Sequence, residues 1–152
     1  MSNINMLVRR EIEARIAGPL IKAFIKELGH DKAIAIVNEV IASLARESGI
    51  QLAKQMDGNS LADFAKGLSA WAADDAFEME VLELSESKYF FNMKRCRYAD
   101  MYKELGLSEL GVVLSCNRDF ELVKGFNPRM KLIRTKTIME GHDCCDFRIS
   151  LE

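Results

Sequence analysis

The sequence has no run of about 18 apolar residues, the length that predicts a membrane-spanning helix. Its first residues show no apolar segment followed by a cleavage site, so no secretory signal is predicted. It has only two prolines and no linker-like or repeated segment. The motifs GxGxxG, GxxxxGKS/T and GxSxG are also missing, so the commonest nucleotide-binding and serine-hydrolase signatures are absent.

Neither sign of charge is in clear excess, because 21 Lys and Arg stand against 23 Asp and Glu. Without a basic patch or a basic amphipathic face, we expect no nucleic-acid and no membrane partner. The 152 residues, 49% of them hydrophobic, predict a single soluble globular domain with a sizeable core.

Four cysteines are present without any CxxC spacing: Cys96, Cys116, Cys144 and Cys145. Because no secretory signal is predicted, we expect reduced thiols in the cytoplasm rather than disulfides. A structural zinc site normally shows CxxC pairs and four ligands. No cofactor is therefore predicted, although a metal held by the cysteines, with His142 as a further ligand, stays open as an alternative.

Residues 1–75 are predicted to be a helical half. Apolar residues recur every fourth position from 8 to 28 and form one stripe along a helix. Pro19 should kink or split that helix, since it lacks a donor and crowds the preceding turn. Gly29 is the expected C-cap, and Asp31 is expected to cap the next helix.

Two further helices are expected in this half. Apolar residues spaced by three or four run from 34 to 56 and end at the turn 57–59. Ser60 and Asp63 resemble a capping box, which predicts a third helix to about residue 74.

Residues 76–152 are predicted to be a strand-rich half. Four segments read as strands: FEMEVLEL (77–84), SKYFFNMKRC (87–96), MKLIRTKTI (130–138) and CCDFRIS (144–150). Helices are expected at 97–106 and, capped by Ser108, through 114 or beyond. The order predicts an α+β fold with N-terminal helices packed against a mostly antiparallel four-stranded sheet that has a helical insert.

The adjacent Cys144 and Cys145 should face opposite ways, because side chains alternate along a strand. Cys145 shares its face with Phe147 and Ile149 and is expected to point toward the core. Cys116 and Asp119 are three residues apart and, in a helix, would lie on one side. A nucleophilic cysteine needs a lowered pKa, which a carboxylate does not supply. A buried structural cysteine is therefore the alternative for Cys116.

Three other residues have both a chemical and a structural interpretation. Cys96 stands at a strand-to-helix junction, where it either faces a cleft or ends a buried strand. Arg134 is able to hold a substrate carboxylate or to be a solvated strand charge. His142 is either a general base or an exposed turn residue.

Several ordered blocks between about 96 and 149 resemble the L-2-amino-thiazoline-4-carboxylic acid hydrolase family. They read CRYADMYKELGLSELGVVLSC, NRD, GFNP, LIRTKTIMEG and CCDFRI. The resemblance implies a cytoplasmic bacterial hydrolase of amino-acid metabolism. Its small-molecule substrate would be a cyclic amidine or thiazoline-type amino acid, opened at a C–N or C–S bond, and a homo-oligomer stays open.

The same resemblance supplies the candidate site residues. The catalytic candidates are Cys96, Cys116, Asp119, Cys145 and Asp146. The substrate-binding candidates are Arg97, Tyr98, Asn127, Arg134 and Thr135. In this interpretation Cys116 attacks the carbon between two heteroatoms, Asp119 or Asp146 hydrogen-bonds a substrate nitrogen, and Arg134 holds the carboxylate.

The segment GHDCCDFRIS also resembles the closing strand of 4-vinyl reductase-type domains, which are small α+β ligand-binding modules. That second resemblance implies the same fold class. It leaves a noncatalytic small-ligand-binding module as the alternative function.

Overall fold

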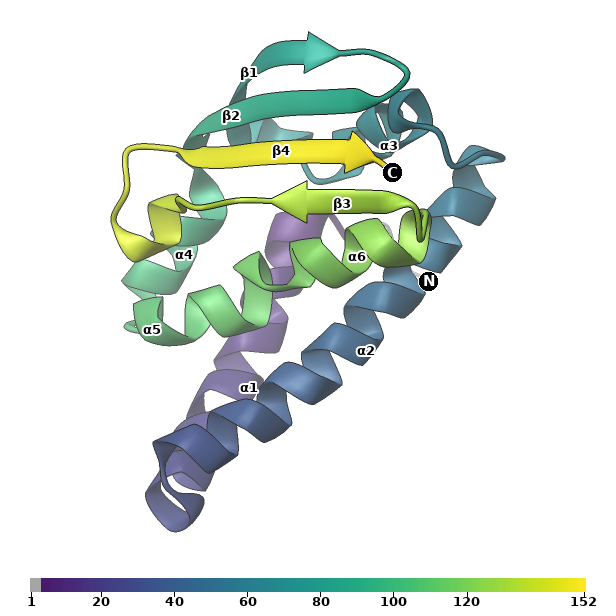
Figure 1. Cartoon of the computed structure of the whole chain (residues 1–152). Helices are drawn as coiled ribbons and strands as arrows, with labels where there is room; N and C mark the ends of the chain where they lie inside the picture. The colour runs from purple at the N-terminus through teal and green to yellow at the C-terminus, as the bar shows by residue number, and fades with distance from the viewer. Residues whose placement is uncertain (1–3) are drawn as a thin grey trace.

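The computed structural model describes residues 4–152 as two long helices followed by a four-stranded sheet with shorter helices packed beside it (Figure 1). The helical half contains α1 (Met6–Leu28), α2 (His30–Met56), α3 (Leu61–Gly67) and the 3-10 turns η1 (Leu68–Ala70) and η2 (Ala73–Asp75). The remaining elements are β1 (Phe77–Leu84), β2 (Lys88–Cys96), α4 (Arg97–Glu104), α5 (Ser108–Gly111), the π-helical turn η3 (Val112–Cys116), α6 (Arg118–Phe126), β3 (Met130–Ile133), the 3-10 turn η4 (Ile138–Glu140) and β4 (Cys145–Leu151).

The sheet is antiparallel throughout, with the strand order β1-β2-β4-β3. The predicted α+β fold, with N-terminal helices against a four-stranded antiparallel sheet and a helical insert, is confirmed. None of the helices in residues 4–152 is long and apolar enough to cross a membrane.

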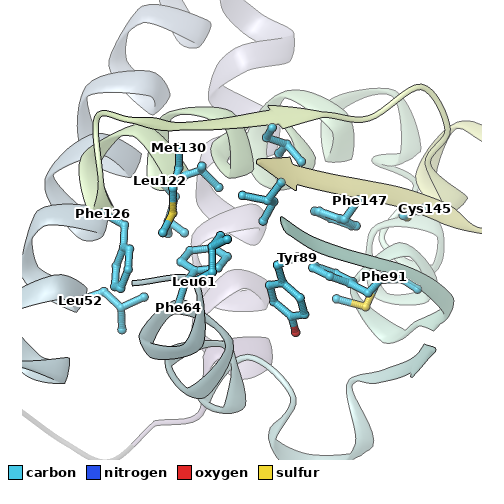
Figure 2. Packing of buried hydrophobic residues seen from close by; sticks show 14 residues of the cluster. Leu52, Leu61, Phe64, Tyr89, Phe91, Leu122, Phe126, Met130, Cys145 and Phe147 are labelled. Carbon is cyan, nitrogen blue, oxygen red and sulfur yellow. The ribbon is translucent and has the colours of Figure 1, made fainter. Parts of the chain in front are cut away.

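The main core lies where α2, α3 and α6 pack against the sheet. Figure 2 shows Phe64 close to Phe126, and Phe91 close to Phe147 and Cys145. The Phe91 and Phe147 rings are stacked with their centroids 4.7 Å apart. Such aromatic burial is the largest single contribution a side chain makes to a core.

Two glycines let α2 and α6 approach closely. A Cβ on Gly49 would lie 2.1 Å from the carbonyl oxygen of Leu122. A Cβ on Gly125 would lie 2.1 Å from the carbonyl oxygen of Arg46. The backbones therefore touch directly, and this contact fixes α6, whose first turn carries part of the site described below.

The helix ends depart from the predictions in several places. Pro19 does not split α1, which runs through it from Met6 to Leu28. Gly29 is the C-cap of α1 as predicted, but it is also the N-cap of α2, so Asp31 is not the cap. Ser108 begins α5 instead of capping it.

The third predicted helix stops earlier than expected. The predicted capping box of Ser60 and Asp63 is confirmed at the start of α3. The helix ends at Gly67 and passes into the 3-10 turn η1, so the prediction to residue 74 is wrong. The left-handed backbone of Asp74 and Asp75 likewise excludes a helix at the predicted end.

The third predicted strand is also shorter than expected, since β3 ends at Ile133 and not at residue 138. The backbone N–H groups of Thr135 and Lys136 donate to the carboxylate of Asp146, at 2.8 and 2.6 Å. These donors are therefore not available for a strand ladder, and the chain turns away from the sheet.

Candidate functional site

A cavity of about 100 Å³ lies between the sheet and the helices. Its apolar walls come from aromatic and sulfur-containing side chains: Phe64, Trp71, Phe77, Phe91, Met93, Met139 and Phe147. An apolar cavity of about 150 Å³ binds benzene, so this volume is on the scale of a small organic ring.

Six of the predicted site residues line this cavity. They come from the end of β2, from α4, η3 and α6, from the segment after β3, and from β4: Cys96, Tyr98, Cys116, Asp119, Arg134 and Cys145. The predicted alternation along the last strand is confirmed, since Cys145, Phe147 and Ile149 all face the cavity. Residues far apart in sequence are thus brought to one place.

Arg134 and Asp119 form the polar centre of the cavity. The Arg134 guanidinium donates to the Asp119 carboxylate at 2.5 Å and to the carbonyl oxygen of Cys116 at 3.1 Å. It also stacks between the rings of Phe120 and Phe147, at 4.9 and 5.2 Å. Arg134 is therefore fixed by four contacts and in turn orients Asp119 and the end of η3.

Cys116 closes a π-helical turn, a local widening of the helix that occurs frequently at functional sites. Burial raises the pKa of the Cys116 thiol strongly, and the charge of Asp119 raises it further against the opposing effect of Arg134. Burial likewise raises the pKa of Cys96, and that of Cys145 to about 11. All three thiols are therefore protonated at neutral pH in the protein alone.

Asp119 faces the cavity beside these thiols. Burial raises the pKa of its carboxyl group, while the charge and the hydrogen bond of Arg134 act in the opposite direction. A carboxylate with a raised pKa next to protonated thiols is able to accept and return a proton.

The other predicted site residues lie outside the lining of the cavity. Asp146 accepts from Thr135 and Lys136 and so fixes the turn after β3. Arg97 is exposed and donates to the carbonyl oxygen of Asp74. Asn127 is buried and ties two loops together through the carbonyl oxygen of Asn59 and the N–H of Arg129.

His142 and Cys144 do not line the cavity either. His142 is exposed, and its Nδ1 lies 3.1 Å from the carbonyl oxygen of Thr137. Cys144 is buried beside the start of β4. Within residues 4–152, no group of three or more His, Cys, Asp or Glu side chains is arranged to hold a metal ion.

Two cavity residues escaped the sequence predictions, namely Arg10 of α1 and Arg118 at the start of α6. Both arginines reach the same carboxylate oxygen of Glu13, at 2.7 and 3.5 Å. Burial and the neighbouring charge of Arg10 lower the pKa of Arg118 to about 10. Two cations thus share one anion, and this side of the cavity carries an uncompensated positive charge.

A signal for Arg10 was present in the sequence. Arg10, Ala14 and Gly18 are four residues apart, so they share one side of α1, and all three are buried. The small side chains mark where α1 packs closely against other elements. Arg10 itself was hidden in a charge-rich run that looks like an exposed surface.

The model of the L-2-amino-thiazoline-4-carboxylic acid hydrolase family matches residues 9–149. No curated protein matches the sequence. Among solved structures, a trafficking protein particle complex subunit 3 from Naegleria fowleri, covalently bound to palmitic acid, aligns with a TM-score of 0.57 and 15% identity over 95% of this chain and 96% of that chain. The phenol-responsive sensory domain of the transcription activator PoxR, with phenol, aligns with a TM-score of 0.58 and 12% identity over 99% and 76% of the two chains. At such identities these structures support the fold alone.

Proposed function

This chain belongs to the L-2-amino-thiazoline-4-carboxylic acid hydrolase family, and we propose that it opens a small thiazoline-type cyclic amidine by adding water. The observation that carries the proposal is the convergence of separated sequence blocks on one cavity. Their chemically active members are Cys96, Cys116, Asp119, Arg134 and Cys145.

The first step assigns the amidine to Asp119. A protonated amidine carries a positive charge and N–H donors, and a carboxylate is a good partner for both. Protonation also makes the carbon between nitrogen and sulfur more electrophilic. Arg134 acts here as a positioning residue, because its guanidinium holds the Asp119 carboxylate.

The second step assigns attack on that carbon to the sulfur of Cys116. A cation held beside a thiol favours the thiolate, so a bound amidinium would lower the pKa that burial has raised. Attack forms a C–S bond to Cys116 and breaks one ring bond, and the ring nitrogen or sulfur leaves with a proton. Water then adds to the same carbon and releases Cys116, so the net change is the addition of one water.

The substrate carboxylate is assigned to Arg118 and Arg10. Arg134 already faces Asp119, whereas Arg118 and Arg10 share the single carboxylate of Glu13. A second anion on that side of the cavity would balance the charge. This assignment differs from the sequence-based expectation, in which Arg134 holds the substrate carboxylate.

The test compares turnover of L-2-amino-thiazoline-4-carboxylate by the wild type, Cys116→Ala and Cys144→Ala, with the product mass as readout. Cys144 is a matched control because it is a buried cysteine that does not line the cavity. We expect activity to be lost in Cys116→Ala and kept in Cys144→Ala. Normal turnover by Cys116→Ala would show that Cys116 is not the nucleophile. Direct attack by a water molecule that Asp119 activates would then be the mechanism.

A second readout identifies the bond that breaks. Cleavage of the C–S bond releases a free thiol on the product, and cleavage of the C–N bond does not, so a thiol reagent distinguishes two products of equal mass. Arg118→Met should raise KM more than it lowers kcat, and it should lose discrimination between the substrate and its uncharged carboxamide.

One observation favours a second candidate, a noncatalytic module that binds a small ligand. The cavity is lined mainly by apolar side chains, and burial keeps its thiols protonated. Solved structures of the same fold hold phenol or covalent palmitic acid. Saturable calorimetric binding of the thiazoline or of phenol, without any turnover of the thiazoline, would favour this candidate over the hydrolase.

A further inference from the structure

The outer side of α1 carries a continuous row of large apolar residues that the chain itself leaves uncovered. The row consists of Val8, Ile12, Ile16, Leu20, Phe24 and Leu28, with exposed fractions between 41% and 66%. The opposite side of the helix is the buried one and carries mainly small residues or Arg10. The stripe predicted from the sequence is therefore a surface feature of this chain.

The neighbouring helix extends this row. Ile36, Val40 and Leu44 of α2 are about half exposed. Leu44 follows Val37 by seven residues, two helical turns, and Val37 packs in the cluster that joins α2 to α1. The side of α2 that carries these residues therefore borders α1. We call the two rows together the α1–α2 apolar face.

The α1–α2 apolar face has the size of a small, reversible interface. The row from Val8 to Leu28 extends about 30 Å and the row from Ile36 to Leu44 about 12 Å, at 1.5 Å per residue, and each helix is about 10 Å wide. The face therefore covers about 400 Å² on one copy and about 800 Å² on two. That total is in the range of weak protein–protein interfaces.

Charged residues beside the α1 row are placed so that those of one copy would meet opposite charges of a second copy. Arg9 and Glu27 are separated by 18 residues, about five helical turns, so they lie on the same side of α1. If two α1 helices pair antiparallel with the two-fold axis at the level of residue 18, Ile16 faces Leu20 of the second copy and Arg9 faces its Glu27. Within residues 4–152, neither Arg9 nor Glu27 takes part in an ion pair.

We propose that the α1–α2 apolar face binds a second copy of this chain in a two-fold symmetric dimer with antiparallel α1 helices. A membrane surface is the less suitable partner, because helices that lie on membranes carry a strongly basic polar face. Here Arg9, Glu11, Arg15 and Glu27 mix both signs along α1. A two-fold axis uses the same patch twice, which is what a self-complementary row requires.

Sedimentation equilibrium of the purified full chain tests the proposal. We expect the wild type to have twice the 17.2 kDa mass of one chain and Ile16→Glu to have that mass once. Ile16 is 66% exposed, so the variant should keep its circular dichroism spectrum and melting temperature. Val81→Glu on β1 is the control, because Val81 is also about half exposed but lies outside the face, and it should stay dimeric.

A charge exchange tests the orientation. Arg9→Glu and Glu27→Arg should each weaken the dimer, and the double variant should recover most of the loss. Equal association of both single variants and the wild type would overturn the antiparallel pairing. A wild type that stays monomeric at all concentrations overturns the dimer, including when it binds anionic lipid vesicles or another protein instead.

Discussion

Replacing Arg134 by methionine tests the electrostatic centre of the cavity. The change keeps much of the side-chain volume but removes the ion pair with Asp119, the hydrogen bond to Cys116 and the stacking on two rings. Breaking a fully buried pair costs about 3–5 kcal/mol. The Asp119 side chain is 38% exposed, which reduces this cost, so we expect about 2–3 kcal/mol.

The pH dependence of that cost gives the prediction a second measurable feature. The folded-state pKa of Asp119 is raised by burial, and removing Arg134 should raise it further. For a raised pKa, stability is fully present below the unfolded value of about 3.9 and is lost as pH rises through the folded value. The penalty of Arg134→Met should therefore grow as pH rises above about 4.

Urea unfolding of the wild type and the variant at about pH 4 and about pH 8 measures both features. Arg134→Met combined with Asp119→Asn should recover most of the loss, because no unpaired carboxylate remains. Lys131→Met is the control, since Lys131 lies three residues earlier, on β3, and forms an exposed ion pair with Glu152. A loss under about 1 kcal/mol that does not change with pH would refute the reasoning.

Gly49→Ala should cost about 2–3 kcal/mol in urea unfolding, because its methyl would lie 2.1 Å from the Leu122 carbonyl oxygen. Ser43→Ala, on the exposed side of α2, is the control and should leave the free energy of unfolding unchanged. Equal stabilities of Gly49→Ala and the wild type would mean that α2 and α6 do not need their close contact. The pKa of Cys145 near 11 predicts slow alkylation at neutral pH, with a rate that increases up to that pH. Mass spectrometry measures this rate, and labelling of Cys145 as fast as that of a free cysteine would contradict its burial. Burial raises the pKa of Asp146, but the hydrogen bonds from Thr135 and Lys136 outweigh this effect and hold the pKa below its usual value. The stability that this carboxylate contributes is therefore present above about pH 3.9 and is lost as pH falls through the folded pKa. Asp146→Asn should therefore cost about 1–2 kcal/mol at neutral pH and much less in acid, and an equal cost at both would contradict the assignment.

The strands could be predicted where local pattern determines structure. The alternation correctly placed Cys145, Phe147 and Ile149 on one buried face, which the structure shows to be the face that lines the cavity. The end of β3 could not be predicted, because it depends on the carboxylate of Asp146, which belongs to another strand. A pattern within one segment contains no information about such a distant acceptor.

The site could be predicted only in part for the same reason. The family blocks indicated Cys116, Asp119 and Arg134, which do line the cavity. Cys116 and Asp119 lie at or just before the first turn of α6, and Arg134 directly follows β3. Arg10 and Arg118 were missed because their place beside the cavity depends on contacts between distant parts of the chain, such as that of Glu13 with Arg118, and the local sequence of each looks like an exposed charged surface.

Incubation of the wild-type protein with L-2-amino-thiazoline-4-carboxylate, followed by mass spectrometry of the small molecule, tests the central claim most directly. The account predicts conversion to a product heavier by one water, with a rate that Cys116→Ala abolishes. Saturable binding of the unchanged thiazoline, with no product after prolonged incubation, would contradict hydrolysis and leave the cavity as a ligand-binding site.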